Sequence, residues 1–275
     1  MDGFGYWSGQ DVRLEFRPAP PDTGVVFVRA DVSPVRRIPG RVPYRIEVPR
    51  RTSLRDGGVR VDMVEHILAS LAGLQIDNCE VWTDNPEMPG CDGSSLPFVA
   101  ALDAAGVVPQ DAVRRQVTVG RTLRVGDARS WVEARPARKP GMTVECHIDY
   151  GPTGPIQRQS LALGVTPETF RGELSAARTF ILEEEANWLR SQGLGARVTC
   201  RDLLVFDDRG PIDNPLRFPN ECVRHKTLDM VGDLALAGCD LAGHFVAHCS
   251  GHRLNAELVA LLLAESARDG LARTA

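Results

Sequence analysis

Residues 64–73 read VEHILASLAG, and residues 223–232 read VRHKTLDMVG. Valine, histidine and glycine occupy the first, third and tenth places of both stretches. Apolar residues recur at helical spacing in each, so both stretches predict a helix that leads into a strand. Two interpretations remain open: a coincidence between two amphipathic helices, or a duplicated half-domain. Duplication predicts that His66 and His225 meet across one cleft.

The surrounding sequence mixes strand and helix patterns without regular alternation. Asp62 is the expected N-cap of the first helix, and residues 33–58 predict an exposed ribbon or loop. Strand patterns occupy residues 12–17, 25–28, 78–82, 117–125, 130–136, 142–150 and 243–247. Helical patterns occupy residues 64–73, 95–105, 167–174, 183–191, 220–232 and 255–267. This mixture predicts an α+β fold of sheets layered on helices rather than a doubly wound parallel sheet.

Composition bounds the class of protein. A chain of 275 residues predicts one large domain or two small ones. The formal net charge of −4 argues against a broad nucleic-acid-binding face, so we expect no nucleic-acid partner. Seven cysteines without a C-x-x-C motif disfavour zinc fingers and a secreted disulfide framework. We therefore expect a cytoplasmic protein, with neither a signal peptide nor an integral membrane segment.

Three residues predict a metal site. His225 and Asp229 lie four apart on one predicted helix and so share a face. His66, from the other stretch, would complete three ligands, which is the number found in open, catalytic zinc sites. The alternative is an exposed His–Asp pair on a helix surface. Asp233, one turn further along, extends the stripe and is placed to orient a neighbouring group.

Two further residues predict acid–base chemistry. Glu65 precedes His66, where a carboxylate can take the proton of an activated water; the alternative is a glutamate that serves only the helix N-terminus. His252 lies in a Ser-Gly-His turn and can protonate a leaving amine or stabilise an oxyanion. We expect His244 and His248 to be structural residues of a strand.

A series of short motifs, distributed along nearly the whole chain, resembles a known family in sequence and in order. They are VEH at 64–66, LAGL at 71–74, IDN at 76–78, PEMP at 86–89, DGSS at 92–95, ARTF at 177–180, LRFP at 216–219, VRHK at 223–226 with Asp229 and Asp233, and SGH at 250–252. Together they resemble the UDP-3-O-acyl-N-acetylglucosamine deacetylases, the zinc amidases of lipid A synthesis. The resemblance implies two similar domains, each a β-sheet on helices, that form a sandwich with the active site at their interface. With the internal match, this predicts domains at residues 1–111 and 112–275.

The resemblance also implies a role for each matching residue. His66, His225 and Asp229 are the implied zinc ligands, and Glu65 is the implied general base. His252 is the implied general acid, oriented by Asp233, and Thr179 is the implied oxyanion-stabilising hydroxyl. Lys226, Phe180 and Arg178 are the implied substrate contacts. An insert at residues 174–198 is expected to form an apolar passage for the acyl chain, lined by Phe180, Ile181, Leu182, Trp188 and Leu194.

Departures from the family pattern keep other functions open. Cys249 stands where the family usually has a lysine before Ser-Gly-His, and that charge suits a nucleotide diphosphate. A zinc amidase for a different acylated amino sugar, or a non-catalytic lipid-binding paralogue, are the alternatives. Zinc suits two histidines and a carboxylate, and iron(II) is also compatible. We expect a UDP-linked acylated amino sugar as the substrate and a monomer as the oligomeric state.

Overall fold

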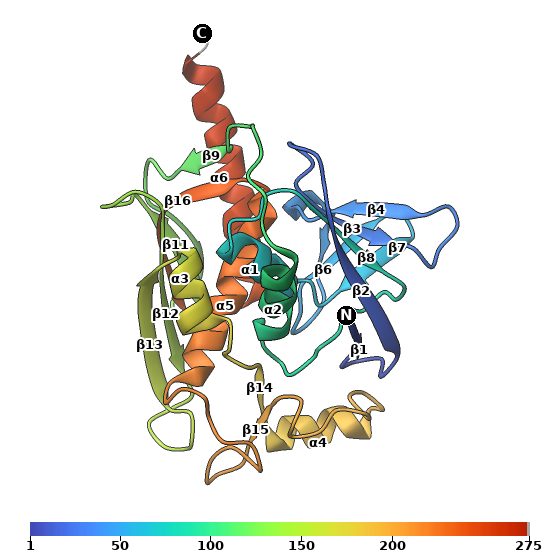
Figure 1. Ribbon diagram of the computed structural model, residues 1–275. Helices are drawn as coiled ribbons and strands as arrows, with labels where there is room; N and C mark the ends of the chain where they lie inside the picture. The colour runs from blue at the N-terminus through green and yellow to red at the C-terminus, as the bar shows by residue number, and fades with distance from the viewer. Residues whose placement is uncertain (274–275) are drawn as a thin grey trace.

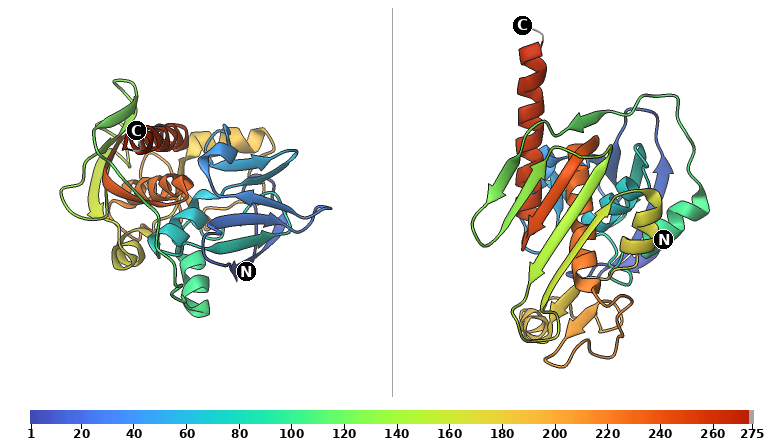
Figure 2. Two further views of the ribbon diagram at one scale, coloured as in Figure 1. Left: turned by 90° about the horizontal axis from the view of Figure 1, so that it is seen from above. Right: turned by 90° about the vertical axis from the view of Figure 1, so that its left-hand side faces the viewer.

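The computed structural model describes residues 1–273, in which a five-stranded sheet and a six-stranded sheet flank a layer of helices (Figures 1 and 2). The first sheet has the order β1 (Asp2–Phe4), β2 (Asp11–Pro18), β8 (Cys79–Thr83), β3 (Val25–Arg29) and β4 (Arg36–Pro39). The second has the order β10 (Leu123–Gly126), β11 (Trp131–Arg135), β16 (Asp240–His248), β12 (Met142–Asp149) and β13 (Arg158–Gly164), and β9 (Gln116–Thr118) extends one end of β16.

The two sheets share one pattern of strand directions. In the first, only the β8–β3 pair is parallel and the other three pairs are antiparallel. In the second, only the equivalent β16–β12 pair on the main path is parallel. The helices match as well: α1 (Glu65–Gly73) precedes β8 and α2 (Leu96–Ala105) follows it, while α5 (Glu221–Leu234) precedes β16 and α6 (His252–Arg273) follows it. The mixed α+β class is therefore confirmed, and the domain boundary after residue 111 stays a prediction.

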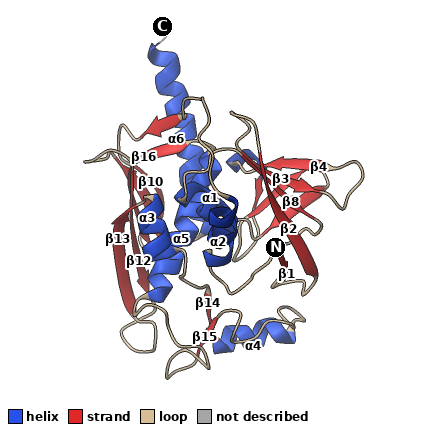
Figure 3. Ribbon diagram, viewed as in Figure 1, coloured by secondary structure: helices blue, strands red, loops and turns tan. Residues whose placement is uncertain are grey.

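Smaller elements surround the two main sheets (Figure 3). Strands β5 (Arg45–Ile46), β6 (Ser53–Asp56) and β7 (Val59–Asp62) form a three-stranded sheet, preceded by the short helix η1 (Val42–Tyr44). Strands β14 (Phe180–Leu182) and β15 (Leu204–Phe206) pair in parallel beside α4 (Glu183–Ser191). The remaining short helices are α3 (Pro167–Thr169), the π-helical η2 (Phe170–Leu174) and η3 (Ala235–Ala237).

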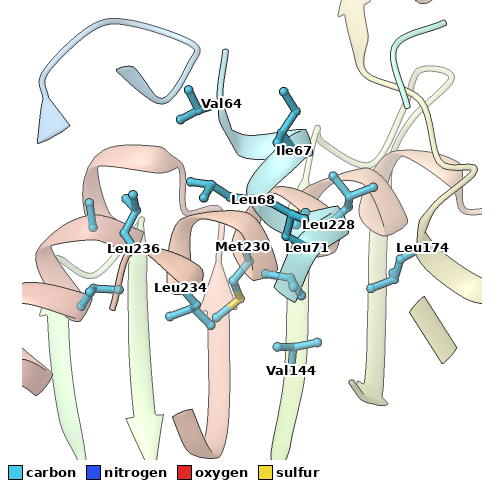
Figure 4. Close-up of a cluster of buried hydrophobic side chains, with 14 of the residues drawn as sticks. Val64, Ile67, Leu68, Leu71, Val144, Leu174, Leu228, Met230, Leu234 and Leu236 are labelled. Carbon is cyan, nitrogen blue, oxygen red and sulfur yellow. The ribbon is translucent and has the colours of Figure 1, made fainter. Parts of the chain in front are cut away.

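Helices α1 and α5 pack closely in the centre of the molecule. A Cβ atom on Gly232 would lie 2.1 Å from the backbone oxygen of Glu65, so only glycine allows this approach. Their buried apolar side chains form one cluster with residues of the second sheet (Figure 4), including Ile67, Leu71, Leu228 and Val144. Each such side chain contributes roughly 1.5–3 kcal/mol when it is fully buried. The two matching stretches thus form the core together.

Several local predictions are wrong. Residues 33–58 are not an exposed ribbon, because they contain three short strands whose Ile38 and Leu54 side chains are fully buried. Asp62 is not a helix N-cap: it ends β7, and α1 begins at Glu65.

Among residues 1–273, no helix has both the length and the apolar character needed to cross a bilayer.

Candidate active site

Helices α1 and α5 bring the three predicted metal ligands together. Oδ1 of Asp229 lies 3.6 Å from Nε2 of His66 and 3.4 Å from Nε2 of His225. The two imidazole rings stand perpendicular, with their centroids 5.1 Å apart. All three residues are buried, and their ligand atoms lie within 4.8 Å of one another. The buried arrangement excludes the alternative of an exposed His–Asp pair.

These separations fit a single metal ion. Two ligands ~2.1 Å from a shared tetrahedral ion stand about 3.4 Å apart. Two imidazole nitrogens and one carboxylate oxygen are a donor set that zinc accepts while keeping a position open for water or substrate. The residues therefore fit a catalytic divalent ion.

The orientation of His225 suits a ligand. Its Nδ1 lies 3.2 Å from the carbonyl oxygen of Ala177, which accepts a hydrogen bond when Nδ1 carries the proton. Nε2 is then unprotonated and faces His66 and Asp229. Burial lowers the pKa of His225 to about 3, so its imidazole is neutral at neutral pH.

Asp229 divides its two oxygens between different partners. Oδ1 faces the histidines, and Oδ2 accepts a hydrogen bond of 2.8 Å from Nζ of Lys226. Burial alone would raise the pKa of Asp229, but His225 and Lys226 hold it well below its usual range. Burial likewise opposes the charge of Lys226, yet Asp229 raises the pKa of that ammonium group. At neutral pH this pair is an ionised carboxylate beside a permanent cation.

Glu65 is the first residue of α1, and its carboxylate lies in the same buried region. Its Oε2 accepts a hydrogen bond of 2.9 Å from the backbone N–H of Thr52. Burial raises the pKa of Glu65 above its usual value, although the nearby histidines oppose the shift. A raised pKa makes a carboxylate a better proton acceptor near neutral pH.

His252 begins α6 and pairs with the fully buried Asp233. Nδ1 of His252 lies 2.9 Å from Oδ2 of Asp233. Burial lowers the pKa of His252, but Asp233 outweighs that effect and raises it to about 9. At neutral pH the imidazole is therefore a cation with a proton on each nitrogen. Nδ1–H faces Asp233, and the proton on Nε2 is available for donation.

The first half of the chain also holds Thr179 in place. Its backbone N–H donates to the carbonyl oxygen of Gly93, 2.7 Å away, in the DGSS stretch. Gly93 has φ +80°, and a Cβ atom there would lie 2.9 Å from the backbone oxygen of Asp202. A glycine is needed at this position because of both the backbone conformation and the close approach.

Phe180 follows Thr179 and covers the metal-ligand cluster. Its ring packs edge-on against His225, with centroids 6.3 Å apart, and Nζ of Lys226 lies 5.9 Å from its centroid. The same ring contacts Phe206, with centroids 6.3 Å apart, so Phe180 packs against both His225 and the apolar strand β15.

A single cavity of about 490 Å³ joins most of the predicted site residues. Its lining includes Glu65, His66, Thr179, Phe180, His225, Lys226, Asp229 and His252. Asp233 lies behind His252, outside the lining, as expected for a residue that orients another. The lining also includes Tyr6, Trp7 and residues 47, 48 and 50, which no motif in the sequence singled out.

Arg178 does not reach this cavity. This residue is buried, with 3 % of its surface exposed, and forms a bidentate ion pair with the fully buried Glu221. The Nε–Oε1 distance is 2.8 Å and the Nη2–Oε2 distance is 3.0 Å. Its remaining donors bind Asn214 and the backbone oxygen of Pro215. The structure therefore gives Arg178 a role in holding the Thr179 segment against α5, and it brings no free charge from Arg178 to a substrate.

The expected apolar passage is formed in part by other residues. Ile181 and Leu194 line the cavity, whereas Leu182 and Trp188 lie at the surface, 38 % and 54 % exposed. Leu189, Val198, Leu203 and Val205 supply the rest of the apolar wall. Helical phase explains the difference within α4, because Leu189 follows Trp188 and points about 100° away from it.

Comparisons with known proteins agree on the family of this chain. The family model described as UDP-3-O-acyl N-acetylglycosamine deacetylase matches residues 1–264. The UDP-3-O-acyl-N-acetylglucosamine deacetylase of Brucella ovis is 41 % identical over 267 residues, covering 96 % of this chain and 92 % of its own length. That of Myxococcus xanthus is 39 % identical over 267 residues, covering 96 % and 84 %. The chain belongs to the UDP-3-O-acyl-N-acetylglucosamine deacetylase family.

Proposed function

We propose that this chain hydrolyses the N-acetyl group of UDP-3-O-acyl-N-acetylglucosamine in a zinc-dependent reaction of lipid A biosynthesis and releases acetate. The observation that carries the proposal is the convergence of His66, His225 and Asp229 in a cavity that also contains a carboxylate and a cationic imidazole. This combination supplies each group that metal-assisted amide hydrolysis requires.

His66, His225 and Asp229 would hold the metal, because their ligand atoms lie within 4.8 Å of one another. Zinc is the first candidate and iron(II) the second, because both accept imidazole and carboxylate ligands. When bound, the ion supplies Lewis acidity, which eases the loss of a proton from water near neutral pH and polarises the amide carbonyl.

Glu65 takes the proton of the attacking water. Its carboxylate is next in sequence to a ligand but has no place among the three ligand atoms. The hydrogen bond from Thr52 to Oε2 leaves Oε1 as the oxygen that receives the proton. The raised pKa of Glu65 suits a base that accepts this proton near neutral pH; the leaving amine takes its proton from His252, and Glu65 returns its own proton when the products leave.

His252 protonates the departing 2-amino group of the sugar. Its raised pKa keeps the imidazolium charged while the amide carbonyl becomes an oxyanion, and Asp233 holds its ring in one orientation. The hydroxyl of Thr179, which also lines the cavity, donates to that oxyanion, and the charge of Lys226 adds to its stabilisation.

The cavity also suits the rest of the substrate. Its apolar wall, from Phe180 and Ile181 to Val205, is matched to the 3-O-acyl chain. The UDP group would lie toward the charged rim, to which Arg253 contributes. The seven cysteines, none of which is paired in residues 1–273, fit a reducing compartment such as the cytoplasm.

The division into domains 1–111 and 112–275 is part of the same proposal. The shared strand order supports two similar halves that contribute one histidine helix each. In this arrangement the active site lies at their interface: Glu65 and His66 come from the first half, and the other catalytic groups come from the second.

Acetate release from UDP-3-O-acyl-N-acetylglucosamine, measured with and without a chelator, tests this function. We expect release that the chelator abolishes and added zinc restores. Turnover of a nucleotide-free acylated amino sugar, but not of the UDP-linked one, would favour the related amidase. Absence of metal-dependent acetate release from both would favour the lipid-binding paralogue.

A further inference from the structure

Thr52 connects the two halves of the acid–base machinery. It is fully buried and lies directly before β6, 13 residues from Glu65 and 181 residues from Asp233. Its backbone N–H donates to Oε2 of Glu65 at 2.9 Å, and its Oγ1–H donates to Oδ1 of Asp233 at 2.5 Å. Its carbonyl oxygen accepts from the backbone N–H of Val64, 3.2 Å away, just before α1 begins. One residue therefore contacts the carboxylate of the proposed base, Glu65, and the carboxylate that orients the proposed acid, His252.

The hydroxyl completes the set of donors around Asp233. Oδ2 of Asp233 accepts from His252 at 2.9 Å and from Nδ2 of Asn255 at 2.8 Å. Oδ1 accepts from Thr52. A buried carboxylate with donors on both oxygens has one orientation, and it passes that orientation to the imidazole it binds. Without the Thr52 hydroxyl, Asp233 can rotate toward its remaining donors and turn the His252 ring with it.

We propose that Thr52 is a positioning residue for the reaction: its hydroxyl sets the Asp233–His252 pair relative to Glu65, so that proton acceptance and proton donation occur on the same bound substrate. The proposal rests on the proposed function, because it takes Glu65 as the base and His252 as the acid. Thr52 is absent from the cavity lining, so it acts through those residues and not on the substrate.

Two variants separate the hydroxyl from the rest of the side chain. Thr52→Val keeps the shape and the backbone N–H to Glu65 but removes the donor to Asp233. Thr52→Ser keeps the donor and removes only a methyl group. We expect kcat of Thr52→Val to fall about 10- to 100-fold with KM within about twofold, because substrate contacts are intact. Thr52→Ser should retain kcat within about threefold of the unchanged protein.

Proton NMR monitors the hydrogen bond between His252 and Asp233 without measuring turnover. The low-field proton resonance of the His252 Nδ1–H, assigned by its loss in His252→Gln, should move in Thr52→Val and stay in place in Thr52→Ser. Metal content and the folded fraction are measured on the same samples, and kcat is expressed per folded, metal-loaded protein.

Glu65→Gln, assayed in parallel, distinguishes the two levels of the proposal. If Glu65→Gln retains full acetate release, the proposed function has lost its base, whatever Thr52 does. If Glu65→Gln is inactive while Thr52→Val matches the unchanged protein in kcat and in the His252 resonance, Thr52 has no positioning role. A Thr52→Ser variant as impaired as Thr52→Val would also overturn the inference, because shape and not the hydroxyl would then decide.

Discussion

At the scale of single residues, the site contains three buried carboxylates that differ in their hydrogen-bond partners. Asp229 faces the histidines with one oxygen, Glu65 receives a donor on one oxygen, and Asp233 is saturated with donors. Burial acts on all three, yet the partner groups differ. The proposed roles of ligand, base and orienting group therefore follow from the surroundings of each side chain, because the carboxylates themselves are chemically similar.

Asp233→Asn should change the pH dependence of the reaction. The negative charge of Asp233 raises the pKa of His252 to about 9, against the effect of burial. A general acid must be protonated, so activity falls as the pH rises through its pKa. We expect the alkaline limb of kcat to lie near pH 9 and to move to lower pH in Asp233→Asn. A limb that stays in place would mean that another group sets it; Asp240→Asn, remote from the site, is the matched control.

Arg178→Ala should damage stability and leave substrate binding unchanged. Its removal strands the buried Glu221, and loss of one partner of a buried ion pair costs about 3–5 kcal/mol. Chemical denaturation measures the loss, and KM of the protein that remains folded should match that of the unchanged chain. The exposed pair of Arg253 and Glu257 offers a control, because Glu257→Ala should change the unfolding free energy by less than ~1 kcal/mol. A raised KM with intact stability would restore the substrate-contact role.

At the scale of elements, the sequence predicted most helices well and the short strands poorly. The exception among the helices is α6, which begins at His252, three residues before the predicted start, and ends at Arg273, six residues after the predicted end. The helical pattern at 183–191 matches α4, and those at 95–105 and 220–232 match α2 and α5 to within two residues. Residues 33–58 misled because two- and four-residue strands rich in arginine and proline are too short to display a period of two. Thr52 and Asn255 could not be assigned a role because their hydrogen bonds to Asp233 depend on tertiary contacts over 181 and 22 residues.

Gly232→Ala should test the closeness of α1 and α5. The added methyl group would lie 2.1 Å from the backbone oxygen of Glu65, so one helix must move. Overpacking of this kind costs about 1–3 kcal/mol, and the movement would shift Glu65 from the ligands. We expect lower unfolding free energy together with lower kcat. Gly172→Ala, where nothing beyond the residue's own helix and chain neighbours lies within 4 Å, should lower neither; equal losses in the two variants would contradict the packing argument.

At the scale of the whole molecule, the proposed metal joins helices from both halves of the chain. An ion bound by His66 on α1 and by His225 and Asp229 on α5 stabilises only the folded state. Removing it by dialysis against a chelator should lower the melting temperature, and zinc should restore it. At 100 times the dissociation constant the ion adds about 2.7 kcal/mol. The His225→Ala variant should show a much smaller response; an equal response would place the stabilising ion elsewhere.

The repeated strand order has a consequence for the history of the chain. Two identical copies related by a two-fold axis would form a symmetric dimer, with one histidine from each copy facing the other across the axis. Fusion of such copies into one polypeptide releases the two helices from symmetry. One helix then keeps Glu65 beside its histidine, while the other carries Arg224 at that place and acquires Asp229 one turn on. A duplication origin predicts this asymmetry: after fusion, an interface that was self-complementary would diverge, and the groups of acid–base catalysis would divide unequally between the two helices.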